Sequence, residues 1–81
     1  MSHFAENIRL LRIRKDWSQT ELASKVGIDK SLVAHWEAGR RKPTVEGVLL
    51  LAKLFEVTVE NLWEVKLREN NFFLATQEEK D

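Results

Sequence analysis

The sequence contains no cysteine, which excludes both disulfide scaffolds and thiolate metal sites. It also lacks a long apolar run: the longest, Val48 to Ala52, is far below the roughly 20 residues that cross a bilayer. The first residues, Met1 to Ile8, have no basic start followed by an apolar stretch, as a signal peptide would. We therefore expect a soluble intracellular protein.

Histidine is scarce as well, with only His3 near the terminus and His35 in the middle of the chain. We expect no carboxylate to orient either one as a base, and two isolated histidines do not make a metal site. An enzyme, a bound metal and a cofactor are therefore not expected. A chain of 81 residues has room for one small domain. It must be stabilised by helix packing, helped by a partner subunit.

The net charge of zero hides an uneven distribution of charge along the chain. Up to Pro43 the sequence has nine Lys and Arg against five Asp and Glu, whereas residues 44–81 have four against eight. A basic half followed by an acidic half indicates one surface that faces a polyanion. The alternative is that these charges only solvate the faces of helices.

Capping residues and glycines divide the first 63 residues into short helices, with no convincing strand between them. Ser18 begins the pattern S-Q-T-E of a capping box, and Gly27 and Gly39 are placed to end helices. In the fourth helix we expect a core stripe of Val45, Val48, Leu51, Ala52 and Phe55. The expected helices, with their capping residues, run from about Phe4 to Lys15, from Gln19 to Val26 (Ser18), from Lys30 to Ala38 (Asp29), from Thr44 to Phe55 (Thr44) and from Val59 to about Trp63 (Thr58).

After Trp63 the pattern is less decisive, and we divide the chain there into a domain of residues 1–63 and an extension of residues 64–81. Glu64 to Thr76 fits either a helix or a short pair of strands, with an extended segment favoured. Gln77 to Asp81 is polar and terminal, and we expect it to be disordered.

The second and third expected helices, joined by a short turn that contains Gly27, have the layout of a helix-turn-helix over about residues 19–38. Two helices that cross steeply need a small residue at the crossing, and Ala23 is placed there. Once packed, the third helix would turn Lys30, Ser31, Ala34 and His35 outward. This face could enter the major groove of DNA.

With S-Q-T-E-L-A from Ser18 and W-E-A-G-R-R-K-P from Trp36, the chain resembles the lambda-repressor-like, XRE-type (Cro/repressor) helix-turn-helix regulators of bacteria and phages. The resemblance covers about Ile8 to Trp63. It implies an all-α, compact five-helix DNA-binding domain, followed here by a C-terminal extension. Two departures are Asp16 and Glu56, which stand where glycine is common at a helix end.

The resemblance also implies roles for individual residues. Gln19 would hold a phosphate and brace the recognition helix, while Lys30, Ser31 and His35 would meet base edges. Leu32 could touch a thymine methyl group, and Asp29 is expected to cap the helix rather than to contact a base. The cations after the recognition helix would clamp the DNA backbone, and an internal ion pair would tie the first helix to the third. These last residues are Arg40, Arg41 and Lys42 for the clamp, and Arg12 and Glu37 for the ion pair.

Apolar residues at positions that the family usually keeps polar or small predict a covered surface. We expect a symmetric homodimer built from the end of the fourth helix, the fifth helix and the tail, unless the tail folds back on its own monomer. The residues are Leu10, Ile13, Leu50 and Leu54 in the helices and Trp63, Val65, Leu67, Phe72, Phe73 and Leu74 towards the end. The foremost candidates for dimer contacts are Leu50, Leu54, Trp63, Phe72 and Phe73.

We expect a sequence-specific regulator, a repressor, that binds double-stranded DNA at a pseudo-palindromic operator as a homodimer in the cytoplasm, at the nucleoid. Its half-site centres would lie about 10 base pairs, or a multiple of this, apart. The alternative is a protein-interaction module, such as the antitoxin of a toxin–antitoxin pair, in which DNA binding is secondary. We expect no membrane contact and no small-molecule ligand, since the chain leaves little room for a pocket of the usual size.

Overall fold

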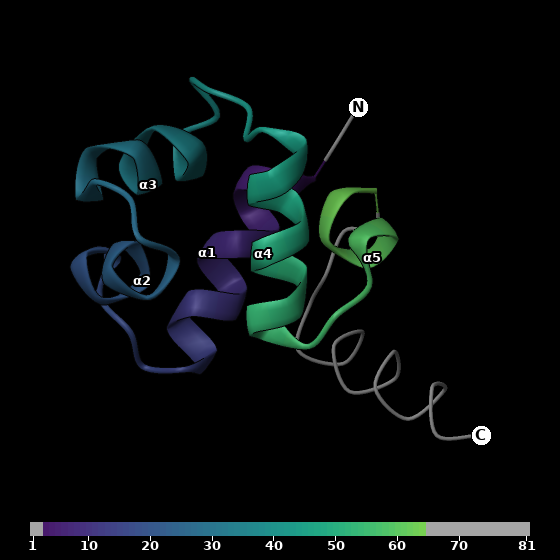
Figure 1. Cartoon of the computed structure of the whole chain (residues 1–81), viewed down its shortest axis with the longest axis horizontal. Helices are drawn as coiled ribbons and strands as arrows, with labels where there is room; N and C mark the ends of the chain where they lie inside the picture. Colours follow the sequence, from purple (N-terminus) through teal and green to yellow (C-terminus); the bar gives the residue numbers. More distant parts are fainter. Residues whose placement is uncertain (1–2, 65–81) are drawn as a thin grey trace.

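The computed structural model describes residues 3–64, which form five α-helices and no strand (Figure 1). The helices are α1 Phe4–Arg14, α2 Gln19–Val26, α3 Lys30–Glu37, α4 Val45–Phe55 and α5 Val59–Trp63. The predicted all-α, five-helix architecture is confirmed. The predictions for the tail fall on residues 65–81, outside the described residues. None of the helices in residues 3–64 is long and apolar enough to span a membrane.

Side-chain caps fix where three of the helices begin. At α2 the capping box is complete: the Glu21 amide donates to Ser18 Oγ at 3.0 Å and the Ser18 amide donates to Glu21 Oε1 at 2.7 Å. Thr44 and Thr58 accept in the same way at α4 and α5, from the amides three residues on, at 3.0 and 2.9 Å. These bonds satisfy amides that have no partner inside the helix, so the chain enters each helix at a defined residue.

Two helix ends carry strain, as their sequence predicts. Asp16, just after α1, and Glu56, just after α4, adopt φ of 60° and 58°. This left-handed conformation costs a residue with a side chain about 1–2 kcal/mol, although Asp tolerates it better than Glu. A third end differs from expectation: Asp29 precedes α3 with extended backbone angles, but its side chain makes no capping hydrogen bond.

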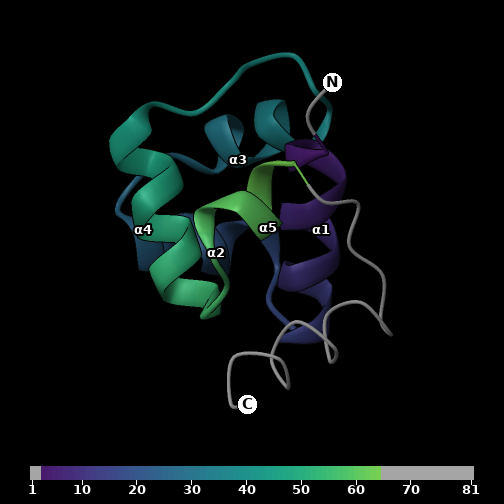
Figure 2. The same ribbon diagram turned by 90° about the vertical axis from the view of Figure 1, so that its right-hand side faces the viewer.

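The core lies where α1 meets α3 and α5, and where α4 meets α2 and α5. Figure 2 shows α5 lying between α4 and α1. Asn7 is buried and joins α1 to α5, since its Nδ2 donates to the Leu62 carbonyl at 2.8 Å. The buried apolar side chains are Phe4, Ile8, Leu11, Leu22, Ala23, Val33, Trp36, Val48, Leu51, Ala52, Phe55 and Leu62.

One member of the expected core stripe on α4 is not buried. Val45 is 76% exposed, whereas Val48, Leu51, Ala52 and Phe55 are buried. Val45 is the first residue of the helix, and its side chain lines a hollow on the surface with Pro43 and Leu49. Spacing along the helix alone could not show that the core ends before this first turn.

Candidate nucleic-acid interface

The α2–α3 pair has the geometry of a helix-turn-helix. Gly27 ends α2 with φ of 81°, a left-handed conformation that glycine adopts without a steric cost. Its amide donates to the Ala23 carbonyl at 2.8 Å, and the Ile28 amide donates to the same oxygen at 3.0 Å. Ala23 itself is buried, as a small residue at a helix crossing should be. The turn therefore sets the direction in which α3 leaves α2.

The face of α3 opposite the core is available to a ligand. Val33 and Trp36 are buried, whereas Lys30 and Ser31 are exposed and Ala34 and His35 are half-buried. The structure thus brings together, at the start and outer side of one helix, the three side chains predicted to meet bases. An ammonium and a hydroxyl group there can both donate to acceptors on base edges.

His35 is oriented by the chain that follows α3. Arg40 Nε donates to His35 Nδ1 at 3.1 Å. Because arginine has no acceptor, Nδ1 must carry a lone pair, so the neutral imidazole has its proton on Nε2. His35 can therefore act as a donor from Nε2. Both residues are predicted as DNA contacts, but nothing in the sequence indicates that Arg40 orients His35.

Leu32 does not belong to the outer face, contrary to its expected role beside a thymine methyl group. Its side chain is half-buried, packs against the core and lines the cavity between α3 and α4. Asp29, by contrast, is exposed at the start of α3 and makes no cap hydrogen bond. Asp29 therefore has the backbone angles of a capping residue, but its carboxylate does not make the expected capping hydrogen bond.

A hydrogen-bonded network joins α1, α2 and α3 beneath this face. Arg12 Nε donates to Glu37 Oε2 at 2.6 Å, and Arg12 Nη2 donates to Glu37 Oε1 at 3.0 Å. Arg12 Nη1 also donates to the Trp17 carbonyl at 2.8 Å. The hydrogen bond to Glu37 raises the pKa of Arg12, so the guanidinium stays charged. The two side chains are only 13% and 5% exposed, so the pair is largely removed from water.

Gln19 connects the first turn of α2 to this network. Its Nε2 donates to Glu37 Oε1 at 3.1 Å, which gives the carboxylate a third hydrogen bond. The bracing of α3 that the resemblance implied is thus a direct contact with the last residue of α3. The contact of Gln19 with a phosphate stays a prediction.

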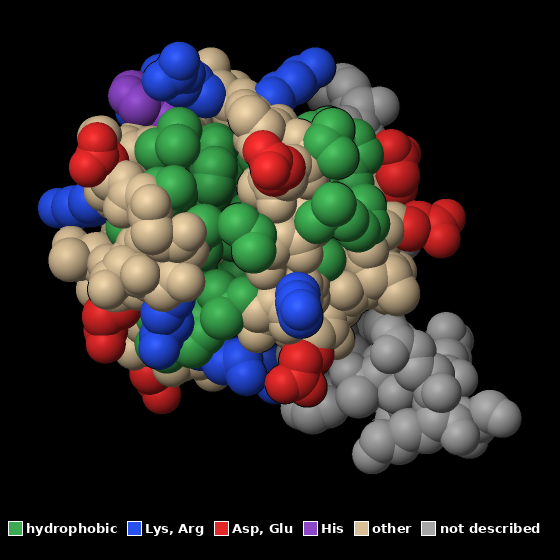
Figure 3. Space-filling model, viewed as in Figure 1, with side chains coloured by type: hydrophobic (Ala, Val, Ile, Leu, Met, Phe, Trp, Pro, Cys, Tyr) green, Lys and Arg blue, Asp and Glu red, His purple; other side chains and the backbone are tan. Residues whose placement is uncertain are grey.

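Three exposed cations follow α3: Arg40, Arg41 and Lys42. Figure 3 shows the histidine and several Lys and Arg side chains along the edge of the molecule that carries α3 and the segment after it. A cationic edge beside a donor-rich helix face suits a polyanion. At the other end of the described chain, His3 Nδ1 lies 3.6 Å from the exposed Glu6 carboxylate, a contact that the sequence reasoning had not expected.

The exposed apolar residues differ in part from those predicted. Leu50 and Ile13 are exposed as expected, while Leu10, Leu54 and Trp63 are half-buried and pack against the core. The structure adds Val45, Leu49 and Val59, which line a surface hollow of about 380 Å³ with Pro43 and Trp63. Phe72 and Phe73 lie outside the described residues. The missed signal was the width of the apolar face of α4, which is too broad for one core stripe.

Comparison with known proteins identifies the family. The Helix-turn-helix family model matches residues 8–62. The regulator AnsR of Bacillus subtilis is 42% identical over 52 residues, or 64% of this chain and 45% of AnsR. The cryptic phage CTXphi transcriptional repressor RstR of Vibrio cholerae is 36% identical over 59 residues, or 73% of this chain and 53% of RstR.

Among solved structures, the restriction-modification controller protein C.AhdI of Aeromonas hydrophila superposes with a TM-score of 0.67 at 33% identity. The match covers 74% of this chain and 91% of C.AhdI. The chain belongs to the XRE-type helix-turn-helix family, as its sequence predicts. It spans about half the length of AnsR and RstR.

Proposed function

We propose that this protein is a sequence-specific regulator of transcription that binds double-stranded DNA with α3 in the major groove. The observation that carries the proposal is the outward face of α3, where Lys30, Ser31 and His35 lie opposite a buried Val33 and Trp36. For the direction of regulation we propose repression, as in RstR, which is named as a repressor. The protein would then act in the cytoplasm, at the nucleoid.

The chemistry of the face suggests how bases would be distinguished. Lys30 can donate to O6 and N7 of guanine, and His35 can donate from Nε2 to an acceptor on a base edge. The Ser31 hydroxyl can both donate and accept a hydrogen bond, so it is compatible with more than one base. Because the Arg12, Glu37 and Gln19 network fixes α3 against α1 and α2, these donors keep one geometry relative to the domain.

The remaining polar groups would position the domain without reading sequence. Gln19 at the start of α2 and the cations Arg40, Arg41 and Lys42 would contact phosphates, and such contacts add affinity and salt dependence. We assign residues 1–63 to this DNA-binding domain and residues 64–81 to an extension that supplies Phe72 and Phe73 as further dimer contacts.

We propose that the active species is a homodimer on a pseudo-palindromic operator, with half-site centres about 10 base pairs or a multiple apart. The hollow of Val45, Leu49 and Val59 supports this, since apolar side chains from two helices form one exposed patch there. A second copy of the same patch would cover it. The interface that we propose therefore lies on the side of α4 that carries Leu49, next to Trp63, rather than on the side of Leu50 and Leu54.

Selection from random duplexes tests both parts. Bound duplexes are recovered at near-physiological salt over several rounds and sequenced. An enriched inverted repeat supports the dimeric regulator, and an enriched single half-site keeps DNA binding but removes the dimer. No enrichment by folded protein would contradict the proposal and favour the protein-interaction module instead.

Matched variants separate the residues that read bases from those that clamp the backbone. Lys30→Ala should relax the preferred sequence at one position, at a cost of about 1–3 kcal/mol for the preferred site. Arg41→Ala should weaken all duplexes alike and reduce the salt slope by about one. If both variants lost affinity uniformly, Lys30 would not contact a base.

Leu49→Glu and Leu50→Glu form a second matched pair, because the two leucines are 54% and 52% exposed on the same helix. Only Leu49→Glu should convert a dimer to a monomer in light scattering, since Leu49 alone lines the patch with Val45 and Val59. Dissociation by Leu50→Glu alone would place the interface where the sequence first suggested it.

A further inference from the structure

A second cavity lies between the helix-turn-helix and the first turns of α4, with a volume of about 480 Å³. Figure 3 shows hydrophobic side chains in a hollow between the α2–α3 pair and α4. Its size lies within the usual range for small-molecule sites. This hollow is larger than expected for a chain that leaves little room for a pocket of the usual size. Its apolar walls are formed by Val26, Ile28, Leu32, Trp36, Pro43 and Leu50.

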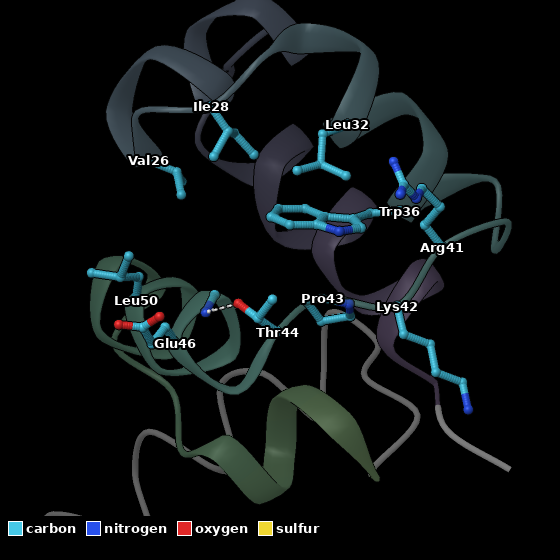
Figure 4. A pocket seen from close by; sticks show the side chains of 11 residues that line it. Val26, Ile28, Leu32, Trp36, Arg41, Lys42, Pro43, Thr44, Glu46 and Leu50 are labelled. Carbon is cyan, nitrogen blue, oxygen red and sulfur yellow. Dashed lines mark hydrogen bonds between the residues drawn. The ribbon is translucent and has the colours of Figure 1, made fainter.

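The indole of Trp36 is the unusual group in this cavity. The residue is only 3% exposed, yet its Nε1 has no hydrogen-bond partner among the described residues. Figure 4 shows the nitrogen-bearing edge of the ring turned toward Pro43 and Thr44. Buried donors without an acceptor are rare in folded proteins, because each has lost its bond to water.

The sequence of α4 explains why the indole N–H has no acceptor from that helix. Gly47 faces this edge, and a Cβ built on it would lie 3.8 Å from Trp36 Cζ2 and 3.5 Å from Pro43 Cβ. Those are ordinary van der Waals distances, so the backbone of α4 approaches the indole closely at this residue. Glycine at this position has no side chain that could accept from the indole.

The charges around the cavity are arranged asymmetrically. In Figure 4 the guanidinium of Arg41 lies at the level of the indole, whereas the Lys42 side chain points away. Glu46 lies toward the other end, beside Leu50. The Arg41 guanidinium and the Trp36 N–H, which is unpaired among the described residues, therefore lie at one end of the apolar cavity. The carboxylate of Glu46 lies at the opposite end.

We propose that this cavity binds a small carboxylate with an apolar body, of about the size of an arylalkyl acid. The apolar part contacts Leu32, Leu50 and the face of Trp36. The carboxylate accepts from Trp36 Nε1 and pairs with Arg41, away from Glu46. Charge complementarity at that end selects an anion over an alcohol or an amine of the same shape.

Proton–nitrogen correlation NMR of the DNA-free protein, titrated with phenylpropionate near neutral pH, tests the site directly. The chain has three tryptophans, and Trp36→Phe identifies the Trp36 indole signal. We expect that signal to move with a Kd on the order of 1 mM. Phenylpropanol and phenylpropylamine should bind about tenfold more weakly or not at all.

Two variants keep the test decisive. Arg41→Gln, at an exposed position, should weaken phenylpropionate about tenfold without unfolding the domain. Leu50→Phe, at a half-exposed position, should narrow the cavity and also weaken it. An unmoved Trp36 signal, equal movement of all three indole signals, or equal binding of phenylpropanol would overturn the proposal.

A consequence rests on the proposed function. Because Arg41 is also a predicted phosphate clamp, bound phenylpropionate should lower affinity for the selected duplex, measured by fluorescence anisotropy. If the protein binds the duplex but the Trp36 signal never moves, this inference fails alone. If the Trp36 signal moves but no duplex is ever bound, the proposed function fails and the ligand site stands.

Discussion

The ion pair between Arg12 and Glu37 provides the sharpest test of how the recognition helix is held. Arg12→Ala would leave the Glu37 carboxylate, only 5% exposed, with the single Gln19 donor, and would leave the Trp17 carbonyl without its guanidinium. Removing one partner of a buried pair costs about 3–5 kcal/mol, because the other charge stays buried and uncompensated. Arg12 is 13% exposed, so we expect the lower end, about 3 kcal/mol.

A loss of about 3 kcal/mol is large for a domain of this size, whose total stability is about 5–10 kcal/mol. Each kcal/mol shifts the Tm of such a domain by about 4–8 °C, so Arg12→Ala should melt at least about 12 °C lower. Circular dichroism during heating and in urea gives both quantities. The control is Arg9→Ala, which removes an exposed arginine from the same helix. Equal losses for the two variants would refute the reasoning.

A double variant distinguishes the pair itself from the space that it occupies. Replacing both partners by apolar residues of similar volume, Arg12→Met with Glu37→Leu, should recover most of the loss, since no charge remains buried. The pH dependence follows from the raised pKa of Arg12. A base whose pKa is raised by folding contributes fully below its unfolded pKa and loses its contribution only as the pH rises through the folded one. This contribution should therefore be constant around neutral pH and be lost only in strongly alkaline solution.

Three further substitutions test local features. Gln19→Ala should lower stability by about 1 kcal/mol in urea melts, because it removes the hydrogen bond to Glu37. It should also weaken binding to every duplex alike in anisotropy, and a change in sequence preference would count against a phosphate contact by Gln19. Glu56→Gly should raise stability by about 0.5–1 kcal/mol, because glycine relieves the positive φ, and an unchanged or lower Tm would argue against strain there. Gly27→Ala should cost about 1 kcal/mol from conformation alone, since its Cβ would meet nothing within 4 Å, and a neutral melt would contradict that.

The bounds of the helices could be predicted almost to the residue, because they are set by interactions between near neighbours. Ser18 and Glu21 bond to each other's backbone three residues apart, and Thr58 caps α5 in the same way. Such bonds depend on sequence spacing rather than on the rest of the fold. Asp29 shows the limit of this reasoning, since the residue has the right backbone angles but its carboxylate makes no cap.

The surface of α4 could not be predicted, because exposure depends on which helices lie against each side. Val45 belongs to the predicted core stripe, yet it is exposed, and so is Leu49. The cavity beside Trp36 is also a tertiary feature: it brings Gly47 of α4 next to an indole that is 11 residues away along the chain. The spacing of residues within one helix cannot predict that Gly47 and Trp36 lie side by side.

The two hollows on α4 have different roles in these proposals, and neighbouring residues separate them. Leu49 lines the hollow with Val45 and Val59, while Leu50 lines the cavity with Trp36. Successive residues of a helix point about 100° apart, so one substitution can alter one side and leave the other intact. Leu49→Glu should therefore disrupt self-association without changing the response of the Trp36 signal to phenylpropionate, and Leu50→Phe should do the reverse. If both variants changed both properties, the two hollows would act as one surface, and either the dimer or the ligand would have to be placed elsewhere.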